Sequence, residues 1–365
     1  MANSKFSPES AVARLHLENI DEDVLAMDAA AIEQYETRIR ILRKLLQLLE
    51  VSRGKGEATD HIERKLKEYH PATVFLDTKE GIERVALAIA QNHPVVTDYG
   101  STYGTAFPLG IRELVAYVRK EEAPLAIVSL ICSKKDALRW MDRDRLHPDL
   151  VDAIDTVGLD MIEGISFIRF PATPEAKEEL GEYYVNGDNE IQVFIVENDP
   201  LMDCLAKKYN IHYIAVRSSN ITGKPEEPFI NGAENYAKDI GAPIFAVRSK
   251  EAFAAQLADQ QISSSEDATV QLRRKRVGSQ PILSFTQKPN SDHPDKMTAV
   301  VELVRAGNTS PETMLALLRD FLDGKIDFHY REEKKAAHTR RMFQVSKDIE
   351  DPIEVKKAIL EATLL

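Results

Sequence analysis

The alternation of strand-like and helix-like segments between residues 73 and 288 constrains the fold more than any other feature. Short apolar runs typical of buried strands, such as 94–98 and 191–196, alternate with segments of helical spacing, such as 80–91 and 200–209. Such a chain buries its helices against a sheet, which is the α/β arrangement. We therefore predict an α/β domain built on one main sheet.

The segments on either side of this region have helical patterns. Apolar residues recur at steps of three and four in 20–51. The sequence of 289–294 has the composition of a linker. Beyond it, Ser310, Pro311 and Gly324 are start and stop signals of one helix. The predicted regions are a helical N-terminal extension at 1–72, an α/β domain at 73–288 and a helical C-terminal region at 289–365.

Composition limits the classes of protein that this chain can belong to. With 365 residues and a hydrophobic share of 43%, the chain has enough apolar material for a sizeable core. Its formal net charge of −12 argues against general nucleic-acid binding, although a local basic patch could still serve RNA. Two cysteines do not suggest a disulfide framework, and no run approaches the roughly 18 apolar residues of a membrane span. We expect a cytoplasmic protein without a membrane segment.

Two turns at the ends of predicted strands carry the polar groups that suit a ligand site. The strand that begins at Tyr213 breaks into Ser218, Ser219 and Asn220, and the strand 94–98 runs into a turn rich in glycine and hydroxyl groups. Ligands of α/β proteins usually bind at such strand ends. The plainer interpretation of each turn is a connection without chemistry.

Five segments in chain order carry a recognisable set of motifs. They are Thr97-Asp98 with Thr102-Tyr103-Gly104, then 117–125, 164–172, 218–223 and 268–270. In this order they resemble the motifs Pro-Thr-Asp-Thr-x-Tyr-Gly (here with an insertion), Lys-x-Arg followed by Pro-Leu, Gly-Pro-Leu-Thr, Ser-Ala-Asn-x-Ser-Gly and Ser-Thr-Val of the Sua5/YrdC/YciO family, the threonylcarbamoyl-adenylate synthases that begin t6A modification of tRNA. The resemblance covers roughly residues 73 to 288, a little over half of the chain.

This resemblance implies a YrdC-like twisted mixed sheet flanked by helices, with the helical N- and C-terminal extensions as additions. It also implies a nucleotidyltransferase that joins bicarbonate, an amino acid and ATP into a carbamoyl-adenylate, with Mg²⁺ on the polyphosphate. Such a reaction needs positioning and charge neutralisation rather than a protein nucleophile or a protein-bound metal. The implied roles are the amino-acid pocket for Thr97, Thr102 and Tyr103, phosphate or carboxylate binding during catalysis for Arg119 and Lys120, and nucleotide binding for Ser218, Ser219, Asn220 and Thr269.

The sequence departs from the family pattern at three positions. Tyr117, Ile195 and Ala268 stand where the family has a lysine, an arginine and a serine. The two cations of the family pattern would face phosphate and carboxylate groups, where charge-assisted hydrogen bonds contribute most of the binding. Arg169 and Arg217 are other cations of the same region that could replace them.

Three functions remain open on the sequence alone. A divergent synthase would release pyrophosphate only in the presence of a suitable acid and bicarbonate. A non-catalytic nucleotide- or RNA-binding module would use 273–276 and the basic segment 331–347, and its RNA affinity would fall steeply with salt. An interaction protein would form a homo-oligomer through its helical extensions, and this oligomer would be lost on removal of 1–70.

Overall fold

The computed structural model describes most of the chain between residues 71 and 364. The described residues are 71–99, 103–109, 128–181, 184–218, 230–239, 242–254, 280–290, 293, 295–330, 342–346, 349 and 351–364. The predicted helix at 20–51, the basic segment 273–276 and the predicted strand at 268–272 lie outside them.

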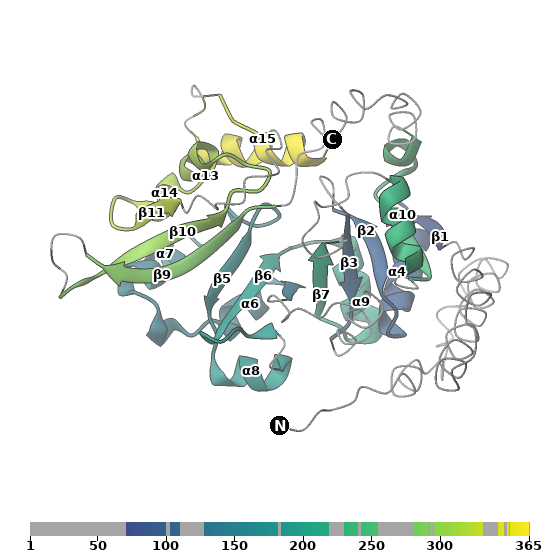
Figure 1. Ribbon diagram of the computed structural model, residues 1–365, viewed down its shortest axis with the longest axis horizontal. Coiled ribbons are helices and arrows are strands. Elements are labelled where there is room, and N and C mark those ends of the chain that lie inside the picture. The colour runs from purple at the N-terminus through teal and green to yellow at the C-terminus, as the bar shows by residue number, and fades with distance from the viewer. Residues whose placement is uncertain are drawn as a thin grey trace, which may run out of the picture.

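The described residues form one mixed sheet of eleven strands flanked by helices, as predicted, in the order β1-β8-β2-β3-β7-β4-β6-β5-β9-β10-β11 (Figure 1). The pairs β2/β3, β3/β7, β4/β7, β5/β6 and β9/β10 are antiparallel, and the others are parallel. The strands are β1 (Ala72–Phe75), β2 (Val95–Asp98), β3 (Tyr103–Phe107), β4 (Ser129–Cys132), β5 (Phe167–Pro171), β6 (Glu190–Ile195), β7 (Tyr213–Ser218), β8 (Ile244–Val247), β9 (Ile282–Pro289), β10 (Met297–Arg305) and β11 (Asp327–Tyr330).

Helices cover both faces of this sheet (Figure 1). We call one face the α7/α10 face and the other the α4/α9 face, because those helices pack there. The helices are α4 (Lys79–Ala90), α6 (Lys134–Trp140), α7 (Pro148–Thr156), α8 (Pro174–Leu180), α9 (Pro200–Tyr209), α10 (Ile230–Asp239), α13 (Pro311–Leu317), α14 (Arg319–Leu322) and α15 (Pro352–Leu364), with a 3₁₀ turn η2 (Arg143–Arg145).

Alternation along the strands decides which face each side chain occupies. On β2, Val95 packs in the cluster of α4 and α9, whereas its neighbour Val96 packs in the cluster of α10. On β4, Leu130 packs with α6 and α7, whereas Ile131 packs on the opposite side. The same two-residue period therefore organises the whole sheet.

Local start and stop signals account for the predicted helices that the structure confirms. The carboxylate of Asp199 accepts a hydrogen bond of 2.9 Å from the backbone N–H of Met202 and caps α9, which ends at Asn210 in the left-handed conformation. The hydroxyl of Ser310 caps α13 in the same way, and Gly324 has a φ of +66° after α14, but the single helix predicted between them is interrupted at Leu318. These caps compensate backbone groups that a helix leaves unpaired at its ends.

The prediction of a wholly helical region after residue 289 is wrong. Residues 297–305 and 327–330 are β10 and β11, and the predicted linker at 289–294 joins β9 to β10. Pro289 pairs with Met297 at the end of the antiparallel hairpin. Linkers and hairpin turns have similar compositions, because both favour residues such as Pro, Asn and Asp that interrupt regular secondary structure.

Three smaller predictions also need correction. The turn predicted after 94–98 is shorter, since β3 already begins at Tyr103. The strand predicted at 124–130 begins only at Ser129, and 124–127 lie outside the described residues. The helix predicted at 134–155 is split into α6 and α7, because Met141 forms a β-bridge with Ala172 between them.

In the described part of the chain, no helix combines the length and the apolar character that crossing a membrane requires.

Candidate functional site

Strand register brings the two polar motifs of the sequence into one row. Thr97 on β2 pairs with Gly104 on β3, and Gly104 pairs with Ser218 on β7. The Thr97-Asp98 and Tyr103-Gly104 residues therefore lie beside Ser218, where the turn that we call the serine turn (218–220) begins, although more than a hundred residues separate them in sequence. The sequence similarity alone did not establish this contact.

Four connections that carry predicted site residues are attached at the same edge of the sheet. β2, β7 and β8 end at this edge, and β4, which is antiparallel to β7, begins there. Thr102 belongs to the connection after β2, and Ser219 and Asn220 belong to the one after β7. Arg119 and Lys120 precede β4, and Thr269 belongs to the connection between β8 and β9.

The side chains of six predicted site residues, and their backbone, lie outside the described part of the chain. For Ser218 the structure describes the backbone alone, as the last residue of β7. The roles of these residues therefore stay predictions. The six are Thr102, Arg119, Lys120, Ser219, Asn220 and Thr269.

Thr97 and Tyr103, which the resemblance assigns to one amino-acid pocket, lie on opposite faces of the sheet. Thr97 shares the α4/α9 face with Val95, two residues before it, and is 3% exposed. Tyr103 pairs with Asp98 instead and packs on the α7/α10 face, with its ring centroid 5.3 Å from that of Phe245. The Tyr103 side chain has no exposed surface, and its contact with a substrate remains a prediction.

Gly104 allows an aromatic ring to pack directly on the motif. A Cβ atom at this position would lie 2.4 Å from Cε2 of Tyr99, which is far inside van der Waals contact. Burial of the Tyr99 side chain, with a smaller effect from Asp199, raises the pKa of its phenol, so the hydroxyl stays neutral. Tyr99 was not among the predicted site residues. The feature of the sequence that could have pointed to it is Gly104 on β3, which leaves room for its ring.

Arg217 and Arg169, the two cations that could replace those missing from the family pattern, lie on different faces of the sheet. Arg217 pairs with Thr105, and the alternation along β7 places it on the α7/α10 face. Arg169 on β5 pairs with Gln192 on β6, on the α4/α9 face that also holds Thr97. Of these two arginines, Arg169 is therefore the one that shares a face of the sheet with Thr97.

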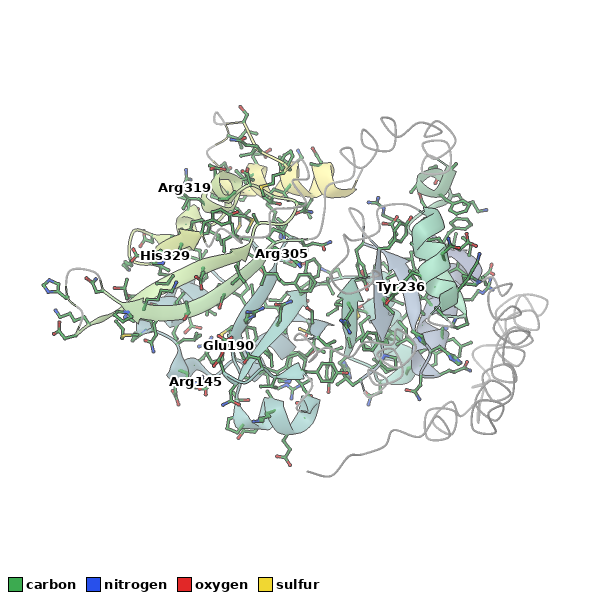
Figure 2. All side chains as sticks on the ribbon, viewed as in Figure 1. Arg145, Glu190, Tyr236, Arg305, Arg319 and His329 are labelled. Carbon is green, nitrogen blue, oxygen red and sulfur yellow. The ribbon has the colours of Figure 1, made fainter. Side chains whose placement is uncertain are left out.

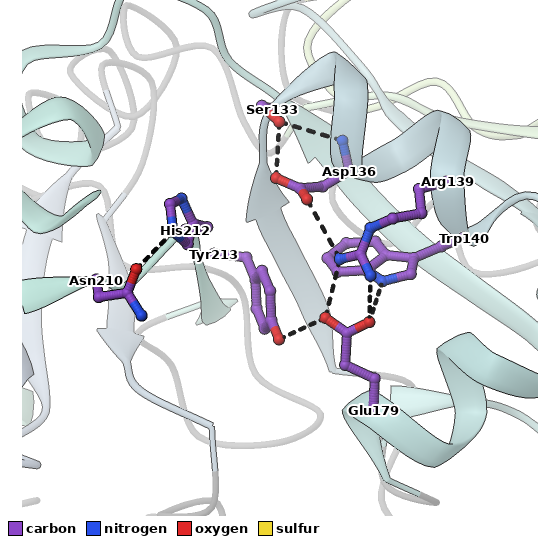
Figure 3. A network of polar contacts seen from close by, with 8 residues as sticks. All are labelled: Ser133, Asp136, Arg139, Trp140, Glu179, Asn210, His212 and Tyr213. Atoms are coloured by element: carbon purple, nitrogen blue, oxygen red, sulfur yellow. Dashed lines mark hydrogen bonds and ion pairs between the residues drawn. The ribbon is translucent and has the colours of Figure 1, made fainter. Parts of the chain in front are cut away.

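A second polar cluster, between α6, α8 and β7, is centred on Glu179 (Figure 3). The Arg139 guanidinium donates hydrogen bonds of 2.6 and 2.9 Å to the two oxygens of this carboxylate. The indole N–H of Trp140 donates another at 3.2 Å, and the hydroxyl of Tyr213 donates one at 2.7 Å. The guanidinium carbon of Arg139 also lies 5.5 Å from the centre of the Trp140 ring.

These contacts make the Glu179 cluster a structural clamp rather than a catalytic group. The hydrogen bonds from Arg139 are the main reason that the pKa of Glu179 falls to about 2. A general base works best with a pKa near the operating pH, and this carboxylate is far below it. Burial and the nearby carboxylate raise the pKa of Tyr213, which keeps its proton for the hydrogen bond.

The described residues contain no group of three or more His, Cys, Asp or Glu side chains that could hold a metal ion. Mg²⁺ in nucleotide-dependent enzymes is bound largely through the phosphates of the substrate, with one or two protein carboxylates. In the predicted site, the cations that nucleotide phosphates would need are Arg119 and Lys120, and both lie outside the described residues.

Comparisons with known proteins return structures but no sequence relatives. No protein-family model and no curated protein matches the sequence. P. abyssi Sua5 complexed with L-threonine is 15% identical with a TM-score of 0.44, and the match covers 70% of this chain and 62% of that one. E. coli YciO is 10% identical with a TM-score of 0.40, over 60% of this chain and 92% of that one. A hypothetical protein from Streptococcus mutans is 12% identical with a TM-score of 0.47, over 72% and 99%.

The chain spans about three fifths of the length of the Sua5 structure that it matches. Sua5 and YciO, two of the proteins that give the predicted family its name, are thus among the solved structures to which this chain is similar. The similarity concerns the fold, a mixed twisted sheet flanked by helices.

Proposed function

We propose that this protein is a nucleotidyltransferase that forms a carbamoyl- or acyl-adenylate from ATP, bicarbonate and an amino acid. The observation that carries the proposal is the common sheet edge at which the connections after β2, β7 and β8 and before β4 are attached. Each of these connections contains residues that resemble a family motif, and the motifs occur in family order. Their meeting at one edge is what a shared ligand site requires.

In this reaction, the amino group of the amino acid attacks the carbon of bicarbonate and forms a carbamate with loss of water. A carbamate oxygen then attacks the α-phosphorus of ATP, and pyrophosphate leaves. Neither step needs a covalent bond to the protein, so the chain contributes orientation and charge neutralisation. Mg²⁺ supplies further neutralisation of the polyphosphate when it is bound.

We propose that the residues at this edge have different roles. Thr97 is buried, so it holds the end of β2 in place and leaves most substrate contact to the connections. In the proposal, Thr102 and Tyr103 shape the amino-acid pocket, Arg119 and Lys120 bind phosphate or carboxylate, and Ser218, Ser219, Asn220 and Thr269 bind the nucleotide. The Tyr99 ring packs on Gly104 beside this edge.

Calorimetry of ATP and AMP binding in the presence of Mg²⁺ tests the nucleotide site. We expect Asn220→Ala to weaken binding at least about tenfold, since a lost hydrogen bond to a ligand costs on the order of 1.4 kcal/mol. Asn235→Ala, an exposed position in α10, is the matched control and should bind like the unaltered chain.

A screen of amino acids for pyrophosphate release, with and without bicarbonate, then tests the chemistry. Release that depends on both ATP and one acid supports the synthase. Absence of any nucleotide binding at millimolar concentration contradicts it, and an RNA titration at several salt concentrations would then test the RNA-binding alternative.

A further inference from the structure

A row of three polar side chains crosses the α4/α9 face in the middle of the sheet. It runs over β4, β6 and β5 and consists of Ser129, Gln192 and Arg169. The amide nitrogen of Gln192 donates a hydrogen bond of 2.6 Å to the Ser129 hydroxyl. A guanidinium nitrogen of Arg169 donates one of 2.9 Å to the amide oxygen of Gln192. The chain of bonds therefore fixes one arm of the guanidinium.

A second nitrogen of the Arg169 guanidinium has no hydrogen-bond partner in the described part of the chain. This nitrogen, Nε, is buried, and no carboxylate among the described residues forms an ion pair with Arg169. Glu302, on the same face beyond Ser284, is bound by Lys288 at 2.9 Å instead. Arg169 thus carries a positive charge in a partly buried position with one amide as its partner.

Such an arrangement costs free energy in the protein alone. A partly desolvated charge without a counter-charge destabilises the folded state, and a buried N–H without an acceptor adds to the cost. The planar guanidinium fork matches the two oxygens of a carboxylate or a phosphate, which would supply both the counter-charge and the acceptor. A bound oxyanion would therefore supply both the counter-charge and the hydrogen-bond acceptor that Arg169 lacks.

An apolar flank next to Arg169 strengthens this interaction. Phe167 and Phe194 lie two residues along β5 and β6 on the same face, with ring centroids 4.9 Å apart. Aromatic rings beside a charge exclude water and lower the effective dielectric constant, which makes a charge-assisted hydrogen bond stronger. They also suit an oxyanion carried on a small carbon skeleton.

We propose that Arg169, oriented by Gln192 and Ser129, binds a small oxyanion, a carboxylate or a phosphate. This site goes beyond the proposed nucleotide site. β5 lies three strand spacings from β7, which leads to the predicted nucleotide-binding turn, and at about 4.8 Å each this is roughly 14 Å across the sheet. Because Arg119 and Lys120 of the proposed nucleotide site would also bind phosphate or carboxylate, substitution of Arg169 is what separates the two sites.

Thermal unfolding of the full chain in inorganic phosphate and in acetate, against chloride at equal ionic strength, tests the proposal. We expect phosphate, acetate or both to raise Tm of the unaltered protein at millimolar concentration, and the pair distinguishes the two oxyanions. Arg169→Gln should reduce the rise to the part that Arg119 and Lys120 of the proposed nucleotide site supply, and Arg169→Lys should weaken binding at Arg169 about tenfold, because an ammonium lacks the fork. Arg319→Gln, an exposed arginine on α14, is the control that should keep the rise (Figure 2).

Gln192→Glu is the sharpest variant, because it places a carboxylate where Arg169 already has its partner. We expect this internal counter-charge to raise Tm without added anion and to reduce the response to phosphate and acetate as much as Arg169→Gln does. A response that is equal in the unaltered chain and in Arg169→Gln would overturn the proposal. So would the absence of any response to either anion, or a loss of stability in Arg169→Gln with the anion response intact.

Discussion

Arg139 and Arg169 lie in two polar clusters of the same sheet, and they differ in how far their charge is compensated. The Arg139 guanidinium donates to both oxygens of Glu179, and the same carboxylate also accepts from Trp140 and Tyr213. Arg169 donates to one amide and keeps a buried Nε without a partner. The first cluster is complete within the protein, whereas the second needs a group from outside.

This difference separates structural charge from charge that is available for binding. A carboxylate with all its acceptor positions in use joins α6, α8 and β7 and has little capacity for a ligand. A guanidinium held by one neutral partner is oriented but not neutralised, which is the state of preorganised binding sites. Counting charges would treat the two arginines alike.

The largest effect should follow from breaking the complete cluster. We expect Glu179→Gln to lower the free energy of unfolding by about 1–2 kcal/mol. Arg139 loses its bidentate partner and keeps Asp136 at 3.3 Å, and the Glu179 side chain is 28% exposed, which limits the cost. Urea unfolding measures it. Glu178→Gln, an exposed neighbour, is the control and should change the value by less than about 0.5 kcal/mol. Equal values for the two variants would show that the clamp contributes nothing.

A second, smaller effect should appear in acid. Because the pKa of Glu179 is about 2 in the folded protein and 4.5 ordinarily, its contribution is complete above pH 4.5 and is lost as the pH falls toward 2. The difference in Tm between the unaltered protein and Glu179→Gln should therefore shrink over this range. A difference that is constant from pH 5 to pH 2.5 would contradict the low pKa.

The smallest effect should come from a pair that is bidentate but exposed. Arg143 donates hydrogen bonds of 3.0 and 2.7 Å to Asp155, and the two side chains are 39% and 54% exposed. Solvent screens such pairs, so Arg143→Gln should leave Tm within about 1 °C of its original value. A shift as large as that of Glu179→Gln would mean that bidentate geometry alone, rather than the additional donors of Trp140 and Tyr213, stabilises the clamp.

The sequence was sufficient for features that depend on neighbouring residues. The limits of α9 follow from Asp199 and Pro200 at its start, and those of β6 and β8 follow from short apolar runs. The strand that leads to the serine turn ends at Ser218, as its composition predicts. Caps and apolar runs act within a few residues, so pattern alone determines them.

Pairing between distant strands was decided by the tertiary structure. Nothing local distinguishes the connection between β9 and β10 from a linker, because its identity as a hairpin depends on what lies on either side. The opposite faces of Thr97 and Tyr103 depend in the same way on the register of β2 against β3.

The sequence by itself determined that this chain has an α/β region with polar turns at its strand ends. Only the tertiary structure decided which turns share an edge, and that Arg169 lies in a row with Gln192 and Ser129 while Glu302 pairs elsewhere. The physical reason is range. Helix caps and strand patterns arise from contacts along the chain, whereas the compensation of a charge depends on groups that folding brings together from distant positions.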